Sequence, residues 1–237
     1  MGKRRSSFSL WWALSWLVLA LFSMVLLVQA WYFGHVLYWV HHNPASTSFM
    51  DARLEALNKK RPGARLSHAW VPYENVSAQL KRAIIAAEDA KFVDHEGFDW
   101  DGIQRALDKN QRRGRLVAGG STITQQLAKN LFLSGERSWL RKGQEAVIAA
   151  MLEAVMEKRR IFEIYLNVVE WGEDVFGAEA AAQRYFGVQA SQLSAEQSAR
   201  LAAMLPRPRF YQRNRDSQYL AKYSSTILAR MPQSKVP

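Results

Sequence analysis

The chain has 237 residues, and its 32 Lys and Arg against 21 Asp and Glu give a formal net charge of +11. Hydrophobic residues make up 49% of the chain, which excludes a disordered tail protein. The chain contains no cysteine, which excludes a disulfide framework, a thiolate zinc site and a cysteine nucleophile. The length suits one soluble domain of ordinary size with an appendage.

The N-terminal segment is basic and then strongly apolar. Lys3, Arg4 and Arg5 open the chain, and no further Asp, Glu, Lys or Arg follows before Asp51. The run from Leu10 to Val28 is interrupted only by serines, and about 20 apolar residues are enough for a helix to cross a hydrocarbon core of about 30 Å. Because positive charge marks the cytoplasmic side of a membrane segment, we expect the N-terminus in the cytoplasm and the remainder outside it.

These features predict the domain organisation. The expected parts are a cytoplasmic tail (1–9), a transmembrane helix (10–33), a linker (34–50) that contains Pro44, and one domain (51–237). A cleaved signal peptide is the alternative, since Val28-Gln29-Ala30 resembles a small-residue cleavage site. The apolar run is longer than the usual signal-peptide core of about 7–15 residues, which favours a retained anchor.

The domain is predicted to be mostly helical. Ser77 is placed to cap an amphipathic helix, Ser194 and Gln197 have the spacing of a capping box, and Asp216 is expected to cap the last helix. Further helices are expected over 144–156 and 162–168, and Pro206 and Pro208 are expected to break the chain between the last two helices.

The first group of candidate catalytic residues lies in the sequence Glu-Asp-Ala-Lys-Phe-Val-Asp-His-Glu-Gly at 88–97. If a helix continues through it, Glu88, Phe92 and His95 share one face, and Gly97 ends the turn. A carboxylate that follows an apolar helix can have a raised pKa, which suits a general base. The alternative is that Glu88 and Asp89 are ordinary surface charges and His95 caps a helix.

The second group is Gly-Gly-Ser-Thr-Ile-Thr-Gln-Gln-Leu-Ala-Lys-Asn at 119–130. Gly119 and Gly120 allow a tight or left-handed backbone, and the hydroxyls that follow can cap a helix whose first N–H groups, with Lys129, could hold phosphate. The segment is not a P-loop, because Gly120 stands where the lysine should be. A glycine turn before a capped helix is the structural alternative.

The third group is Arg-Lys-Gly-Gln-Glu at 141–145. On a helix, Arg141 and Lys142 lie on the same face as Glu145, with the cations before the anion. This is the poorer orientation for simple helix support, which favours a role in a site. A fourth segment, Lys-Arg-Arg-Ile-Phe-Glu-Ile-Tyr-Leu-Asn at 158–167, is explained equally well as an amphipathic helix with a solvated basic start.

In this order and spacing, the segments resemble the motifs of the monofunctional biosynthetic peptidoglycan glycosyltransferases, whose domain also forms the first half of bifunctional penicillin-binding proteins. The resemblance runs from about Ala69 to about Met231 and includes Ala-Ala-Gln-Arg-Tyr-Phe-Gly at 181–187. The Tyr-Asn-Pro-like turn frequent in the family is absent, because Gln212 and Arg213 follow Tyr211. No Ser-x-x-Lys or Lys-Thr-Gly of a transpeptidase occurs, so a monofunctional enzyme is expected.

The resemblance implies a mainly α fold: a lysozyme-like transglycosylase head with a smaller membrane-apposed lobe, behind one N-terminal transmembrane helix. It implies polymerisation of lipid II into β-1,4-linked glycan strands of peptidoglycan, with release of undecaprenyl pyrophosphate. Because the donor bond is α and the product bond β, the displacement inverts the anomeric carbon.

The resemblance also assigns roles to residues. Glu88 would be the general base, and Glu145 the second catalytic carboxylate, which organises the donor pyrophosphate. The expected substrate- and pyrophosphate-binding residues are Lys129, Arg141, Lys142, Ser121, Thr122, Gln125, Gln126 and Asn130, and the expected cleft-shaping residues are Asp89, Phe92, His95 and Gly97. No tightly bound cofactor is expected; a divalent cation, Mg²⁺ or Mn²⁺, on Glu145 is an alternative to the cationic side chains.

The implied location is the bacterial inner membrane, in a single pass with a cytoplasmic N-terminus and a periplasmic catalytic domain. Expected partners are lipid II, the growing lipid-linked glycan, the membrane and other cell-wall synthesis or division proteins, and no nucleic acid. Two other functions compete with this one. A peptidoglycan-cleaving lytic enzyme would explain a catalytic Glu but not the Arg-Lys-x-x-Glu cluster, and a non-catalytic membrane-anchored scaffold would tolerate Glu88→Gln.

Overall fold

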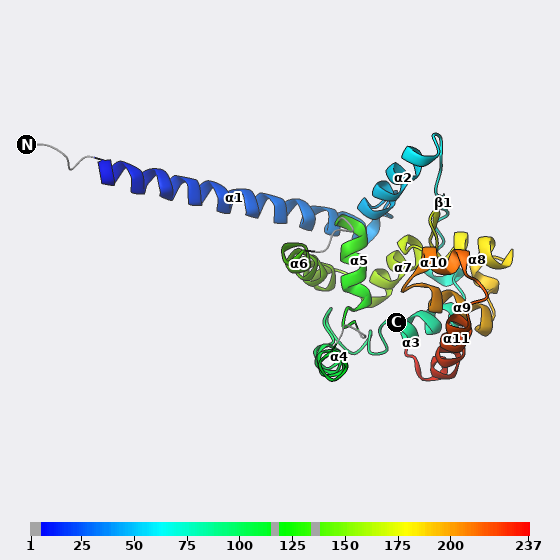
Figure 1. Cartoon of the computed structure of the whole chain (residues 1–237). Helices are drawn as coiled ribbons and strands as arrows, with labels where there is room; N and C mark the ends of the chain where they lie inside the picture. The colour runs from blue at the N-terminus through cyan, green and yellow to red at the C-terminus, as the bar shows by residue number, and fades with distance from the viewer. Residues whose placement is uncertain (1–5, 115–118, 134–137) are drawn as a thin grey trace, which may run out of the picture. The chain divides into compact units, whose positions relative to one another are not determined.

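The structure is a computed structural model, and it describes residues 6–114, 119–133 and 138–237. These residues form two compact units, Met1–His42 and Asn43–Pro237. Helices account for most of the described residues, which confirms the mainly α fold class (Figure 1).

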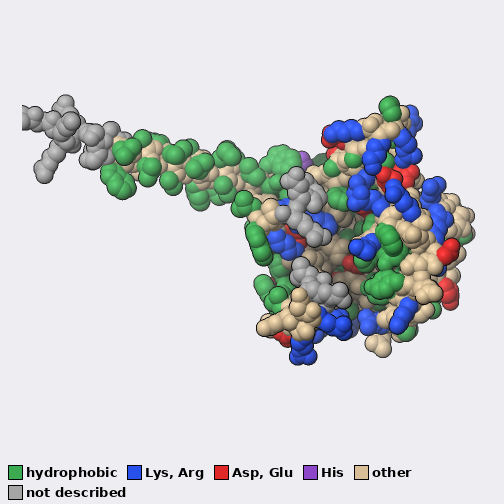
Figure 2. Space-filling model, viewed as in Figure 1, with side chains coloured by type: hydrophobic (Ala, Val, Ile, Leu, Met, Phe, Trp, Pro, Cys, Tyr) green, Lys and Arg blue, Asp and Glu red, His purple; other side chains and the backbone are tan. Residues whose placement is uncertain are grey.

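The first unit is one long helix, α1 (Ser6–His41). Its stretch Leu10–His41 is long and apolar enough to cross a membrane, and Figure 2 shows hydrophobic side chains along its visible face. The helix continues through residues 34–41, which we expected to belong to a linker. Gly34 does not end the helix, and the first proline that could break it is Pro44.

The second unit, which we call the head, is built from short helices and one small parallel sheet. The helices are α2 (Ser48–Lys60), α3 (Ala78–Glu88), α4 (Trp100–Arg113), α5 (Ile123–Phe132), α6 (Trp139–Val155), α7 (Lys158–Val168), α8 (Ala178–Phe186), α9 (Ala195–Met204), α10 (Pro208–Arg213) and α11 (Gln218–Arg230). The strands are β1 (Ser67–His68) and β2 (Val175–Phe176), with Ser67 opposite Val175, and the 3-10 turns are Tyr73–Asn75, Ala190–Gln192 and Met231–Gln233.

The head has two groups of helices joined by α7. Helix α9 packs against α3 and α11, whereas α5 packs against α6 and α2, and Figure 1 shows α4, α5 and α6 on one side of the head and α8, α9 and α11 on the other. Helix α7 contacts both α5 and α8. Its Ile161, Phe162 and Tyr165 are fully buried, so this helix forms the centre of the core.

Most of the helix starts predicted from the sequence are confirmed. The Ser77 side chain accepts a hydrogen bond from Gln79 N at the start of α3, and Ser194 and Gln197 form the capping box of α9. The prediction for Asp216 is wrong, because Ser217 occupies the N-cap position of α11. Asp216 lies one residue too early for its carboxylate to meet the free N–H groups of the first turn.

The connection between α9 and α11 also differs from the expectation. Pro206 follows the end of α9, but Pro208 begins the short helix α10. A proline is well accommodated in the first helical turn, since its missing N–H would have no partner there. The side chain of Gln212, which follows Tyr211, accepts a hydrogen bond from Glu173 N at 2.8 Å and so connects α10 to the loop before β2.

Candidate active site

Glu88 is the last residue of α3, and its carboxylate lies at the edge of a cavity. The apolar side of this helix, which includes Leu80 and Ile84, is buried in the core. The helix ends at Glu88, and Asp89 is its C-cap. The expectation that Glu88, Phe92 and His95 share one helical face is therefore wrong, because the chain from residue 89 to Gly97 forms turns.

Asp89, Phe92 and His95 hold this turn region together. The Asp89 carboxylate accepts hydrogen bonds from His95 Nε2 at 2.9 Å and from the backbone N of Ile123 at 3.0 Å. Phe92 is fully buried, with its ring 5.5 Å from the Phe162 ring. These contacts support the predicted cleft-shaping role, because they connect the end of α3 to the start of α5.

Gly97 ends the turn region in the left-handed backbone region, with φ +82°. A Cβ at this position would lie 3.1 Å from Glu153 Cγ. Glycine is the residue that adopts this φ without steric cost, so the sequence prediction that Gly97 closes the turn is confirmed.

The backbone N–H groups at the start of α5 form hydrogen bonds within the protein. The Thr122 side chain caps the helix by accepting from Gln125 N, and the Gln125 side chain accepts from Thr122 N. The backbone N–H of Ile123, which has no partner within the helix, donates to the Asp89 carboxylate. Thr122 and Gln125 are buried, and protein groups accept from the N–H groups of Thr122, Ile123 and Gln125, which agrees with the structural alternative of a capped helix.

Neither Gly119 nor Gly120 has a positive φ, and only at Gly120 would a side chain meet a neighbouring segment. A Cβ on Gly120 would lie 3.1 Å from the Cα of Ile103 in α4. Of the tight or left-handed backbone that these glycines allow, the left-handed form is not adopted at either position. The absence of a side chain at Gly120 instead lets the segment before α5 lie against α4.

Thr122→Ala should lower the free energy of unfolding by about 1–2 kcal/mol, because it removes an N-cap and a buried hydroxyl that donates to Gly97 O at 2.7 Å. Denaturant unfolding of the variant measures this loss. Ser225→Ala on the exposed face of α11 is the control, and we expect it to change stability by less than about 0.5 kcal/mol. Equal stabilities of the two variants would contradict the capping role.

Glu145 lies on α6 and carries a cation on each carboxylate oxygen. Arg141 Nη1 is 2.9 Å from Oε2, and the Lys142 ammonium contacts Oε1. The Lys142 Nζ also lies 3.1 Å from Ser121 Oγ, just before α5. The Glu145 side chain is only 3% exposed, so the sequence prediction of one cluster on one helical face is confirmed.

Both predicted carboxylates line one cavity of about 770 Å³. The residues that line it are Glu88, Ser121, Gln126, Lys129, Ser138, Trp139, Arg141, Lys142, Glu145, Leu205 and Pro206. All are in the head, and Figure 2 shows a hollow on the visible face of the head, with Lys and Arg side chains beside it. The structure thus brings together two motifs that lie more than fifty positions apart in the sequence.

Lys129 links the two carboxylates electrostatically. Burial has the largest effect and lowers the pKa of Lys129. The charge of Glu145 raises this pKa, the charges of Arg141 and Lys142 lower it, and the charge of Glu88 raises it. The three cations outnumber the two carboxylates. A buried surplus of positive charge costs free energy unless an anion binds beside it. The cavity is therefore suited to a ligand that carries concentrated negative charge.

Glu88 has the electrostatic environment of a base. Burial raises its pKa, while the hydrogen bond from Gln126 and the charge of Lys129 lower it and Asp89 raises it. Gln126 Nε2 donates to Glu88 Oε2 at 2.8 Å, and the Tyr165 hydroxyl donates to Gln126 Oε1 at 3.0 Å. Tyr165 thus orients the amide that holds the carboxylate, a positioning role that the sequence motif alone did not reveal.

If Glu88 serves as the base of a reaction, Gln126→Leu should move the acidic limb of the pH–rate profile to higher pH. The lost N–H donor stabilises the ionised carboxylate, so its removal raises the pKa of Glu88 further, and a base acts only when deprotonated. A hydrogen bond to a charged group is worth about 1.5–3 kcal/mol, so we expect kcat/KM below the limb to fall by about 10-fold. An unchanged limb would show that the titrating base is another group.

The residues described by the structure contain no group of three or more His, Asp or Glu that could hold a metal ion. Glu145, the residue to which we assigned the alternative divalent cation, has both oxygens engaged by Arg141 and Lys142. A cation on this carboxylate would share its oxygens with two positively charged side chains, whose repulsion opposes its binding.

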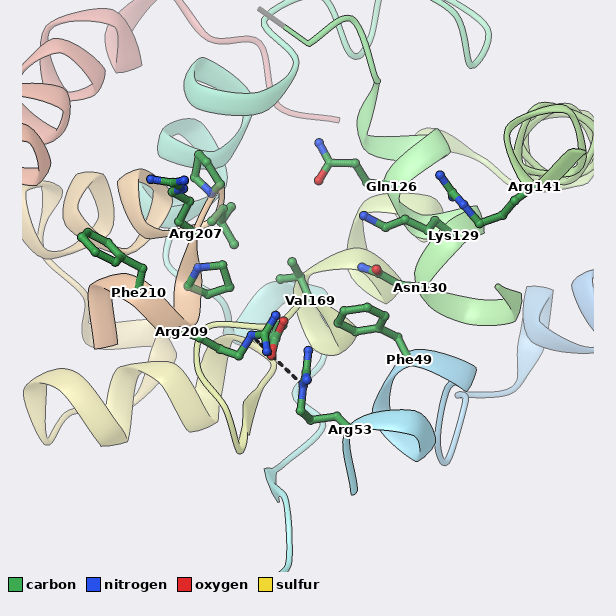
Figure 3. A pocket seen from close by; sticks show the side chains of 14 residues that line it. Phe49, Arg53, Gln126, Lys129, Asn130, Arg141, Val169, Arg207, Arg209 and Phe210 are labelled. Atoms are coloured by element: carbon green, nitrogen blue, oxygen red, sulfur yellow. Dashed lines mark hydrogen bonds and ion pairs between the residues drawn. The ribbon is translucent and has the colours of Figure 1, made fainter. Parts of the chain in front are cut away.

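A second cavity of about 740 Å³ adjoins the first. Both cavities are lined by Gln126, Lys129, Arg141, Leu205 and Pro206. The second also includes the predicted residue Asn130, together with residues that the sequence motifs did not indicate: Phe49, Arg53, Val169, Glu170, Arg207, Pro208, Arg209 and Phe210 (Figure 3). No local pattern in the sequence points to this set, because its members come from three distant segments.

Comparison with known proteins agrees with this geometry. Residues 55–232 match the Transglycosylase family model. The chain is 60% identical over 224 residues to the biosynthetic peptidoglycan transglycosylase of Herminiimonas arsenicoxydans, covering 94% of this chain and 97% of that protein. It is also 60% identical over 229 residues to the protein of the same name from Azoarcus sp. (strain BH72), covering 97% and 99% of the two chains.

The match covers most of the chain, and the matched region includes both carboxylates and the cations between them. The mainly helical head is accordingly the lysozyme-like domain of this family. The chain therefore belongs to the peptidoglycan transglycosylases, and it is an enzyme of the glycosyltransferase class.

Proposed function

We propose that the enzyme polymerises lipid II into β-1,4-linked glycan strands and releases undecaprenyl pyrophosphate. The observation that carries the proposal is that Glu88 and Glu145 line one cavity with Lys129, Arg141 and Lys142. A base and a cluster of cations are the two features that a displacement with a diphosphate leaving group requires.

In the proposed reaction, Glu88 removes the proton from the 4-hydroxyl of the acceptor sugar. The oxygen then forms a bond to the anomeric carbon of the donor, on the face opposite its phosphate. The bond between that carbon and the phosphate oxygen breaks, and the electron pair leaves with the diphosphate. One displacement inverts the anomeric carbon, so no covalent intermediate is needed.

Lys129, Arg141 and Lys142 stabilise the charge that develops on the leaving diphosphate. Glu145 holds Arg141 and Lys142 in place before substrate arrives, and preorganised cations stabilise developing charge without rearrangement during the reaction. Ser121, Gln126 and Asn130 line the two cavities and would contact the sugars or phosphates. Thr122 and Gln125 would act indirectly, through the start of α5. A divalent cation on Glu145 is the alternative source of charge.

The test is incubation of the purified protein with lipid II, with and without a chelator. We expect glycan polymer and free undecaprenyl pyrophosphate in both samples. Shortening of preformed glycan with no polymer from lipid II would instead indicate a lytic enzyme. Loss of polymerisation with the chelator, and its recovery with Mg²⁺ or Mn²⁺, would assign part of the charge neutralisation to a metal ion.

We further propose that α1 anchors the enzyme in the bacterial inner membrane, with the head in the periplasm. The head presents its own apolar surface, because Trp139 and Leu140 at the start of α6 are 92% and 89% exposed and Trp100 on α4 is also exposed. Such side chains can insert into the interface of a bilayer. Other cell-wall synthesis or division proteins are proposed partners in the same membrane.

A chain without residues 1–40 should remain folded and still bind liposomes, because the head is a compact unit with its own apolar surface. Replacing Trp100 and Leu140 by Ser should weaken its co-sedimentation with liposomes by about 10-fold or more, given about 1.5–3 kcal/mol for each large apolar side chain. Tyr219→Ser on α11, also exposed, is the control. Equal binding by all three proteins would exclude these helices as the membrane-facing surface.

A further inference from the structure

The second cavity carries a charge arrangement that the proposed chemistry does not use. Beyond the residues it shares with the first cavity, its charged lining consists of three arginines, Arg53, Arg207 and Arg209, and one acid, Glu170. Arg53 comes from α2, Glu170 follows α7, and Arg207 and Arg209 lie at the start of α10. The packing of three separate segments therefore creates a pocket with a surplus of positive charge.

Glu170 lies between two of these arginines. Its Oε1 is 3.0 Å from Arg53 Nε and 3.7 Å from Arg209 Nε, and Figure 3 shows the side chains of Arg53 and Arg209 pointing toward one another. The Glu170 side chain is only 9% exposed. Burial of an acid costs free energy unless cations compensate it, so this carboxylate holds Arg53 in place by a hydrogen bond and attracts Arg209 by its charge.

Aromatic rings fix the arginines further. The Arg53 Cζ lies 5.4 Å from the centre of the Phe49 ring, and the Arg207 Cζ lies 5.7 Å from the centre of the Phe210 ring. Guanidinium groups that stack on aromatic faces lose less conformational freedom when a ligand binds. The pocket thus differs from a solvated surface with scattered basic residues, because its cations are preorganised around an open volume of about 740 Å³.

The chemistry of the pocket favours a carboxylate. The planar fork of arginine matches a carboxylate in a bidentate geometry. Glu170 neutralises one of the three arginine charges, and the two that remain can each bind one carboxylate, whereas the leaving diphosphate has Lys129, Arg141 and Lys142 in the first cavity. The substrate of the proposed reaction carries such groups away from its reacting atoms, on the peptide attached to the disaccharide.

We propose that Arg53, Arg207 and Arg209 form a subsite that binds the peptide carboxylates of the lipid-linked disaccharide or of the growing glycan. This inference rests on the proposed function, since the subsite adjoins the cavity of Glu88 and Lys129. The arginines are specificity-determining residues: they distinguish substrates by the charge of the peptide and leave the displacement at the anomeric carbon to the first cavity.

The experiment compares two substrates with the full chain in detergent. One is lipid II with free peptide carboxylates, and the other is the same compound with those carboxylates converted to primary amides. A hydrogen bond to a charged group is worth about 1.5–3 kcal/mol, so we expect kcat/KM for the amidated substrate to be lower by about 10-fold or more. Arg209→Gln should remove most of this preference by lowering kcat/KM for the carboxylate substrate alone.

The variants are chosen to preserve the fold. Arg209 is 55% exposed, and its replacement leaves the Arg53–Glu170 ion pair intact. The double variant Arg53→Gln, Glu170→Gln removes both members of that pair, so no buried charge is left without a partner. Arg184→Gln, an exposed position on α8, is the control and should keep the full preference.

The outcomes separate this inference from the proposed function. Polymer from both substrates at equal kcat/KM in the unaltered enzyme would overturn the subsite and leave the polymerisation intact. No polymer from either substrate would refute the proposed function itself. If Arg209→Gln lowers kcat/KM equally for both substrates, the subsite does not bind the peptide carboxylates. If Arg209→Gln then has no effect on kcat/KM with a monophosphate-linked substrate, the pocket binds a phosphate group instead.

Discussion

Glu88→Gln should lower kcat for polymerisation by about 10²–10⁴-fold, the range typical of a positioned general base. The amide keeps the shape of the side chain but cannot accept the proton of the attacking hydroxyl. Because burial disfavours the charged form of Glu88, the neutral amide should not destabilise the fold. Polymer formation from lipid II measures the loss, and binding of a fluorescent lipid II analogue should change by less than about 3-fold.

The pH dependence of the unaltered enzyme gives a second measure of the same role. Activity should fall as the pH drops through the pKa of Glu88, because only the ionised form accepts a proton. Burial raises that pKa, so the fall should begin at a higher pH than the value of about 4.3 for an exposed glutamate. Glu157→Gln, at an exposed position, is the matched control. Substantial polymerisation by the Glu88→Gln enzyme would refute the assignment of the base.

Lys129→Ala should lower kcat/KM by about 10²–10³-fold, the loss typical when one donor to a developing charge is removed. Lys129 lines both cavities and interacts with both Glu88 and Glu145. Its removal leaves the leaving diphosphate with Arg141 and Lys142 alone. The Lys129→Ala change should also move the acidic limb of the pH–rate profile to higher pH, because the charge of Lys129 lowers the pKa of Glu88.

The role of Lys129 in phosphate binding is tested with a monophosphate-linked substrate. If Lys129 acts on the diphosphate, the variant should be impaired less with the monophosphate than with the diphosphate, relative to the unaltered enzyme. The same relative loss with both substrates would contradict the assignment. Lys222→Ala on the exposed side of α11 controls for a general effect of removing positive charge.

Where the sequence motifs were predictive, the interactions are local. Glu145 meets Arg141 and Lys142 one helical turn away, so helix periodicity is enough to predict the cluster. The expectation of a phosphate site at the start of α5 depended on neighbouring elements that the motif does not contain. The N–H groups at the start of α5 are not free for phosphate, because Asp89, which lies 34 positions earlier, accepts from Ile123 N.

The amino-acid sequence determined the long apolar N-terminal helix, most helix starts, the two carboxylates proposed for the site and, through the motif order, the family. The tertiary structure decided how these parts act together: it placed Glu88 and Glu145 in one cavity, aligned Tyr165 behind Gln126, and brought Arg53 to Glu170 across 117 positions. The physical reason is that caps and helical pairs depend on residues within one turn. Contacts between distant segments depend instead on how the apolar faces of α2, α5, α6 and α7 pack, and hydrophobic burial, being non-directional, leaves no local pattern for such contacts.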